Sequence, residues 1–205
     1  MNKLRRRPKS AAPEGAWGRR VEAAAKAPTA RHGIRHALAT RRPPKNTHKG
    51  DFYMKKIASF SVDHTKFGVG MYISRIDGDI VSYDVRMVKP NGGTYLSNPS
   101  LHTIEHLFAT FARNSALSDN VIYVGPMGCR TGFYLLMRGF DHDAAINLTR
   151  RALEFISKYE GVIPGYSEIE CGNWLEHDLE SAKRDVLPLL EVLKDYTPEK
   201  LDYPQ

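Results

Sequence analysis

The sequence predicts an α+β domain in which an antiparallel β-sheet packs with helices. Three observations predict it: strand-like runs come mainly first after residue 53, helical runs come mainly last, and a hairpin signal joins the first two strand-like runs. The 205 residues suffice for one domain with a core, and 41% hydrophobic with 26% charged residues is typical of globular proteins. No run of about 18 apolar residues occurs, so the sequence predicts no membrane-spanning helix.

Residues 1–53 differ in composition from the rest of the chain. They hold 14 Lys/Arg against 3 Asp/Glu, whereas residues 54–205 hold 16 against 20, so the net charge of +7 comes from the first quarter. The segment is rich in Arg, Ala and Pro and has no sustained period, which predicts disorder. A basic arm for nucleic acid and a transit peptide are alternatives. We interpret the segment as an extension without function, with Met54 as the true start.

The first predicted elements are two strands that flank Asp77 and Gly78, a dipeptide typical of hairpins. Hydrophobic and polar residues alternate in the second strand. Its two faces consist of Val81, Tyr83, Val85 and Met87 on one side and Ser82, Asp84 and Arg86 on the other. This period of two predicts a strand that turns one face to the core.

The later elements are read from apolar runs and helix stop signals. In chain order they are an apolar run at 121–128, a strand at 132–140, a helix from about 143 to 159 and a last helix at 178–196. Gly161 and Pro164 stop the first of these helices. Pro188 is predicted to kink or interrupt the second, because proline lacks the N–H that continues a helix.

The segment SLHTIEHLFATFARN, residues 100–114, carries the candidate chemistry. Read as a helix, it has Asn98 as its cap and Pro99 at its first position. At about 100° per residue, an apolar stripe faces one side and a polar stripe the other. The two stripes are Ile104, Leu107, Phe108 and Phe111, and His102, Glu105, His106 and Ala109. Two imidazoles at i and i+4 can reach one metal ion, with the glutamate as a base beside it.

A metal centre of this kind needs a third ligand. Cys171, followed by Gly172, offers a thiolate, and a His2Cys set leaves a coordination position open for catalysis. His177 is a competing ligand that we rank below Cys171. The only other cysteine is Cys129, and two cysteines are too few for a disulfide scaffold, which predicts a reducing compartment.

Cys129 stands in the glycine-rich segment GPMGCRTGF. Gly125, Gly128 and Gly132 are predicted to let the backbone approach a ligand and to place Cys129 in a turn. The neighbouring Arg130 would lower the pKa of the thiol. A small buried cysteine without chemistry is the alternative. Beside a metal, a carboxylate and a thiol that move protons indicate chemistry on a polarised carbonyl, and these residues by themselves leave the substrate open.

Five blocks of the sequence resemble the S-ribosylhomocysteine lyase family (LuxS, autoinducer-2 synthase). They are SFSVDH, YDVRMVKPN, PSLHTIEHLFATFARN, GPMGCRTGFYL and ECGNWLEHDLESAK. The blocks occur in the family's order and spacing and cover about residues 54–205, whereas residues 1–53 have no counterpart. The resemblance implies a LuxS-like fold and a cytoplasmic carbon–sulfur lyase. Its substrate would be S-ribosylhomocysteine, and its products homocysteine and 4,5-dihydroxy-2,3-pentanedione, the precursor of autoinducer-2 in quorum sensing and part of the activated methyl cycle.

The resemblance also implies roles for single residues. The metal ligands would be His102, His106 and Cys171, holding Fe(II) natively, with Zn or Co as substitutes. Glu105 and Cys129 would be the general acid/base pair. The positions that match the substrate pocket are Ser59, His64 and Arg86. The family site lies at a homodimer interface, so these three would reach the metal of the other chain.

The implied reaction gives each part a task. Moving the carbonyl of the sugar from C1 to C2 and then to C3 makes the C4 proton acidic, so that the sulfur on C5 leaves by β-elimination. Each move needs a Lewis acid on neighbouring oxygens and bases that pass protons between carbons. Arg86 would bind the α-carboxylate of the substrate through a bidentate contact, and an ion pair with Asp84 is the alternative.

Rival interpretations come from other protein classes. H-x-x-E-H is also the inverted zinc-protease signature, but there the third ligand is usually a carboxylate. Peptide deformylase uses His2Cys, but with H-E-x-x-H. A nucleic-acid-binding protein would depend on the basic residues 1–53, and the acidic balance after Met54 argues against it. A purely structural metal site would require four tight ligands and no activity.

Overall fold

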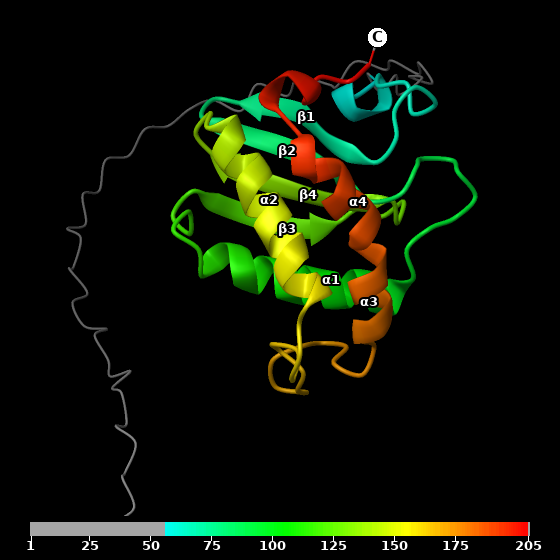
Figure 1. Cartoon of the computed structure of the whole chain (residues 1–205), viewed down its shortest axis with the longest axis vertical. Helices are drawn as coiled ribbons and strands as arrows, with labels where there is room; N and C mark the ends of the chain where they lie inside the picture. Colours follow the sequence, from blue (N-terminus) through cyan, green and yellow to red (C-terminus); the bar gives the residue numbers. More distant parts are fainter. Residues whose placement is uncertain (1–55, 205) are drawn as a thin grey trace, which may run out of the picture. The chain divides into compact units, whose positions relative to one another are not determined.

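The computed structural model describes residues 56–204, and Figure 1 shows how their elements are arranged. The extension at residues 1–53 and the start at Met54 lie outside the described residues. Among residues 56–204, every helix is too short or too polar to cross a bilayer.

A four-stranded antiparallel sheet lies at the centre, with the strand order β1-β2-β4-β3. The strands are β1 (Gly70–Asp77), β2 (Ile80–Arg86), β3 (Val121–Pro126) and β4 (Gly132–Arg138). The predicted hairpin is confirmed, since Asp77 pairs with Ile80 across a turn in which Gly78 has a φ of 60°. The α+β class with an antiparallel sheet is therefore confirmed.

The alternation in β2 places its apolar face in the core as predicted. Val81, Tyr83 and Val85 are at most 1% exposed. The polar face of the same strand is also buried at its end, where Asp84 and Arg86 are 1% and 3% exposed. A buried charge needs a partner, so this end of the strand is the first sign of a site.

Helix α1 (Asn98–Arg113) carries the two histidines of the H-x-x-E-H motif. Its cap is Ser97 and not the predicted Asn98, because Ser97 has an extended backbone and its side chain accepts a hydrogen bond from the Ser100 amide. Pro99 lies in the first turn, where its missing N–H costs no hydrogen bond.

The two stripes predicted for α1 are present. Ile104, Leu107 and Phe108 are fully buried in the core, and Phe111 is half-buried against the ring of Phe155, 5.3 Å away. His102, Glu105 and His106 of the polar stripe remain partly exposed, and Ala109 packs against the edge of the core. The apolar face of the helix therefore packs into the core, and the polar face is accessible to a ligand.

Three more helices follow β4. They are α2 (His142–Ser157), α3 (Leu179–Asp185) and α4 (Leu187–Val192), with the short 3-10 helices η1 (Ala58–Phe60), η2 (Leu193–Asp195) and η3 (Pro198–Lys200) elsewhere in the chain. Pro188 lies in the first turn of α4, so the predicted interruption of the last helix is confirmed. In Figure 1, α2 and α4 lie over one face of the sheet, and α1 runs beside β3.

Candidate active site

Four side chains that can bind a metal converge at the polar stripe of α1. His102 and His106 come from the helix, and Cys171 and His177 come from the loop between α2 and α3. Their ligand atoms all lie within 4.8 Å of one another, and the Cys171 Sγ is 3.3 Å from the His102 Nε2. The structure therefore brings together the three predicted ligands and adds the competing His177.

Backbone carbonyls fix which nitrogen of each helix histidine faces the cluster. The Nδ1 of His102 donates to the carbonyl oxygen of Glu176 at 2.9 Å, and the Nδ1 of His106 donates to that of Pro164 at 2.6 Å. Because a carbonyl oxygen only accepts, the ring proton sits on Nδ1 in both cases. The Nε2 lone pairs are left for a metal, as in typical histidine metal sites.

Gly165 lets the loop come this close to His106. Its φ is 78°, and a Cβ there would lie 2.9 Å from the imidazole. Any other residue would push away the backbone that carries the Pro164 carbonyl. In the sequence, Pro164 indicates only a helix stop, and no local signal points to Gly165, because its partner His106 lies 59 positions away.

The Nδ1 of His177 also donates a hydrogen bond, in this case to a side-chain hydroxyl. Its Nδ1 is 3.2 Å from the Thr103 hydroxyl, which itself donates to the Pro99 carbonyl and so accepts from His177. The Nε2 of His177 is buried and has no hydrogen-bond partner among residues 56–204. Burial, together with the charges of His102 and His106, lowers the pKa of His177 to about 4, so its ring is neutral at neutral pH.

The orientation of the rings distinguishes the two predicted helix ligands, His102 and His106, from His177. The rings of His102 and His106 are nearly perpendicular, at 88°, so their in-plane lone pairs can meet at one point. The rings of His102 and His177 are stacked 4.1 Å apart at 18°, so their lone pairs lie in two nearly parallel planes that do not share a point close to both rings. Two imidazoles and a thiolate, beside an unpartnered buried nitrogen, form a donor set that fits a divalent metal.

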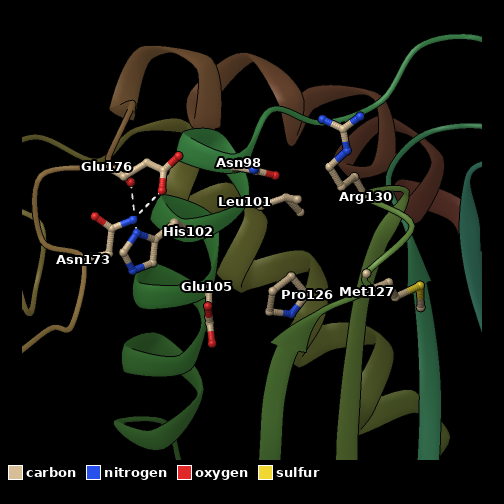
Figure 2. Close-up of a pocket in the computed structure, with 10 residues that line it drawn as sticks. Asn98, Leu101, His102, Glu105, Pro126, Met127, Arg130, Asn173 and Glu176 are labelled. Atoms are coloured by element: carbon tan, nitrogen blue, oxygen red, sulfur yellow. Dashed lines mark hydrogen bonds between the residues drawn. The ribbon is translucent and has the colours of Figure 1, made fainter.

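Glu105 lines an open cavity of about 430 Å³ next to this cluster. Figure 2 shows His102 and Glu105 on α1, Pro126 and Met127 on the neighbouring segment at the end of β3, and Arg130 at the upper right. Glu105 and His102 thus line the same open cavity, at a place that a small polar molecule can reach.

Three of the other four predicted residues line a second cavity, of about 490 Å³, and Ser59 is not among its lining residues. His64, Arg86 and Cys129 line it, and the Nδ1 of His64 donates to the Val62 carbonyl at 3.0 Å. Ser59 lies on the short helix η1, half-buried. Gly128 and Arg130 line both cavities, so the turn between β3 and β4 separates the predicted site residues of one chain into two groups.

Cys129 lies beside a guanidinium and a hydroxyl. The Arg86 Nη1 is 3.6 Å from the Cys129 Sγ and also donates to Thr131, whose hydroxyl is 3.0 Å from the same sulfur. Partial burial raises the pKa of the Cys129 thiol, but the hydrogen bonds of Thr131 and the charge of Arg86 lower it overall. The prediction that Arg130 does this is wrong. Arg130 instead faces the ring of Tyr95, 5.8 Å away.

The turn predicted around Cys129 is confirmed, with one change. Arg130 N donates to the Met127 carbonyl at 2.9 Å, which places Cys129 in the middle of the turn. Gly128 has open space around it and lines both cavities, as expected for a glycine that faces a ligand. Gly132 serves the sheet instead, because a Cβ there would overlap the carbonyl of Val85 in β2.

Comparisons with known proteins agree with this geometry. The family model described as S-ribosylhomocysteinase (LuxS) matches residues 57–199. The chain is 44% identical over 158 residues to the S-ribosylhomocysteine lyase of Phocaeicola vulgatus, covering 74% of this chain and 98% of that protein. It is 40% identical over 157 residues to that of Borreliella burgdorferi and 39% over 158 residues to that of Clostridium acetobutylicum, each aligned over 74% of this chain and 100% of the relative.

Proposed function

Because this chain belongs to the S-ribosylhomocysteine lyase (LuxS) family, we propose that its metal cluster, Glu105 and Cys129 act together on S-ribosylhomocysteine. The function is that of a carbon–sulfur lyase, which cleaves the thioether to homocysteine and 4,5-dihydroxy-2,3-pentanedione, the precursor of autoinducer-2. The observation that carries the proposal is the convergence of His102, His106 and Cys171 beside a cavity that Glu105 lines.

His102, His106 and Cys171 are the proposed metal ligands, and Fe(II) is the metal that the family favours, with Zn or Co as substitutes. When bound there, such a metal supplies Lewis acidity to the oxygens of the sugar. The perpendicular rings of the two helix histidines support this set. His177 remains a neutral neighbour that adds no positive charge. Both cysteines are free thiols, which supports a cytoplasmic location.

Cys129 and Glu105 are the proposed groups that move protons. The lowered pKa of Cys129 increases its thiolate fraction at neutral pH, and a thiolate can take a proton from a carbon next to a carbonyl and return it to the neighbouring carbon. Two such transfers carry the carbonyl from C1 to C3. Glu105 serves the same steps from the other cavity. Removal of the C4 proton then forms a C4=C5 double bond, while homocysteine leaves with the electron pair of the C5–S bond and takes up a proton. The resulting enol gains a proton at C5 and loses its hydroxyl proton to give the diketone.

Residues 54–205 are proposed to form the complete lyase domain, with residues 1–53 as an extension that the reaction does not need. We expect both the full chain and a version that starts at Met54 to release homocysteine from S-ribosylhomocysteine at equal rates. The thiol is measured as it appears. Absence of thiol from both proteins would contradict the proposed function, and a dead truncation alone would show that the extension is required.

We propose that a second copy of the chain completes the site. One chain holds Glu105 with the metal cluster and, in a separate cavity, Cys129 with Arg86 and His64. Large apolar side chains are exposed on the segments that carry these two groups. They are Phe60 at 68%, Ile169 at 97% and Leu175 at 70% exposure. Such exposure is typical of a surface that another chain covers, and a two-fold pair would bring each metal cluster to the Cys129 group of its partner.

Mixing two dead variants tests this arrangement. A dimer with shared sites has two of them. In a mixed dimer of Glu105→Ala with Cys129→Ala, one of these two sites contains both an intact Glu105 and an intact Cys129, and the other contains neither. Random exchange of chains should therefore restore about a quarter of the wild-type thiol release. Each variant alone is the control. If both residues of a site came from one chain, every site in the mixture would lack one of them and no activity would return.

A further inference from the structure

The polar end of β2 holds a buried ion pair. Asp84 is 1% and Arg86 3% exposed, and the Arg86 Nη2 donates to the Asp84 Oδ2 at 2.7 Å. The Arg86 Nε and the Asp84 Oδ1 lie 2.7 Å apart as a second charged contact, although neither atom has an aligned hydrogen bond. A buried pair of this kind depends on every further hydrogen bond that its carboxylate receives.

The extra hydrogen bond comes from the far end of the chain. The hydroxyl of Tyr203 donates to the Asp84 Oδ2 at 2.7 Å. Burial and the negative charge of Asp84 both raise the pKa of Tyr203, so its hydroxyl stays protonated and remains a donor. The ring stacks on Tyr72 with centroids 5.0 Å apart and meets Phe67 edge-on at 4.9 Å. Phe67 in turn lies 5.4 Å from the guanidinium carbon of Arg86.

The backbone before Tyr203 is tied to strand β1. The Ile73 amide donates to the Leu201 carbonyl at 2.8 Å, and the Tyr196 hydroxyl donates to the Met71 carbonyl at 2.6 Å. Leu201 itself is fully buried in the core. The hydroxyl of Tyr203 is therefore delivered to Asp84 by a fixed segment.

We propose that Tyr203 is a positioning residue for Cys129, because it holds the Asp84 carboxylate and thereby fixes the Arg86 guanidinium against the Cys129 sulfur. The chain of contacts runs from Tyr203 to Asp84, from Asp84 to Arg86, and from Arg86 to the thiol. This inference rests on the proposed role of Cys129 in proton transfer.

Loss of the Tyr203 hydroxyl changes two things in the same direction. Without the hydrogen bond from Tyr203, the negative charge of Asp84 attracts the Arg86 guanidinium more strongly. The guanidinium is then held less firmly at the Cys129 sulfur. Both changes make the Cys129 thiolate less stable. The other charged or titratable groups that line this cavity are His64, Tyr95 and Arg130. Tyr134 and Tyr72 also lie within electrostatic reach of this network, Tyr134 of Cys129 itself and both of Asp84 and Arg86. All five groups remain in the variant.

The test is the pH dependence of Cys129 alkylation in Tyr203→Phe, which keeps the ring and its packing. Iodoacetamide reacts with the thiolate, and mass spectrometry of peptides separates Cys129 from Cys171. We expect the alkylation curve to move to higher pH and the rate at pH 7 to fall about threefold or more. The acidic limb of kcat/KM should move with it. Tyr159→Phe is the matched control, since it removes another tyrosine hydroxyl hydrogen bond, to the Val162 carbonyl.

Unchanged alkylation in Tyr203→Phe would overturn the inference, and so would an equal change in Tyr159→Phe. Metal content and melting temperature are measured alongside to show that the fold is intact. If Tyr203→Phe proves unstable, Tyr203→Trp keeps an aromatic ring there but does not retain the phenol, and the same alkylation curve then decides. Because the readout is ionisation of a thiol, it stands even if the chain fails to turn over S-ribosylhomocysteine, so failure of the inference and of the proposed function are distinguishable.

Discussion

Replacing Glu105 or Cys129 by alanine should abolish homocysteine release while the metal stays bound. Neither residue belongs to the proposed ligand set, and each lines a cavity at which it can exchange protons with a sugar. Loss of one general acid/base typically costs about 10²- to 10⁴-fold in rate, and here each group serves several transfers in sequence. We expect both variants to fall at the upper end of this range in a thiol-release assay, with about one metal per chain by elemental analysis.

Glu154→Ala is the matched control for the glutamate. Glu154 is partly exposed on α2, where it pairs with Lys158 at 2.7 Å, so its removal should leave turnover unchanged. A Glu105→Ala enzyme with normal turnover would remove the carboxylate from the mechanism. A Cys129→Ala enzyme with normal turnover would do the same for the thiol, and with it the role of Arg86 at that sulfur.

His102→Ala should release the metal, whereas His177→Ala should keep it. The first variant removes a nitrogen whose ring plane crosses that of His106, and the second removes a ring that is stacked on His102 in a nearly parallel plane. We expect metal affinity in His102→Ala to fall by more than about 100-fold, beyond what loss of an outer partner costs. Competition with a chelator, followed by metal analysis, measures this directly.

His142→Ala is the control for loss of a histidine, because its Nδ1 contacts the Tyr83 hydroxyl at 2.7 Å, away from the cluster. Full metal occupancy in His102→Ala would refute the assignment of the centre. Equal loss of metal in His177→Ala would instead favour four tight protein ligands, which is the arrangement of a structural site. The absorption spectrum of a Co-substituted protein provides a second measure, because it changes with the number of ligands.

Much of the fold follows from local patterns in the sequence. The period of two in β2, the two stripes of α1 and the interruption at Pro188 depend on neighbours a few positions apart, and each was predicted correctly. The cap of α1 was wrong by one position because both Ser97 and Asn98 are good caps, and only the backbone angles of Ser97 decide between them.

The candidate site divides in the same way. The motif on α1 places two imidazoles and a carboxylate on one helix face, and this much the sequence determined by itself. The backbone carbonyls that orient these imidazoles come from loops far away in the sequence. The Pro164 carbonyl, which orients His106, is an example. Residue chemistry already made Cys171 the preferred third ligand over His177, but the stacking that distinguishes His177 from the proposed ligands required coordinates.

The sequence alone thus determined the class of fold, the helix face that carries the metal motif and the residue types of the reaction. Only the tertiary structure decided that Arg86, and not the adjacent Arg130, acts on Cys129, and that Tyr203 reaches the same network. The physical reason is the separation along the chain of the residues that interact. Helix and strand periods follow from local backbone geometry, whereas the pKa of a thiol depends on charges that meet it across the folded sheet, whatever their distance along the chain.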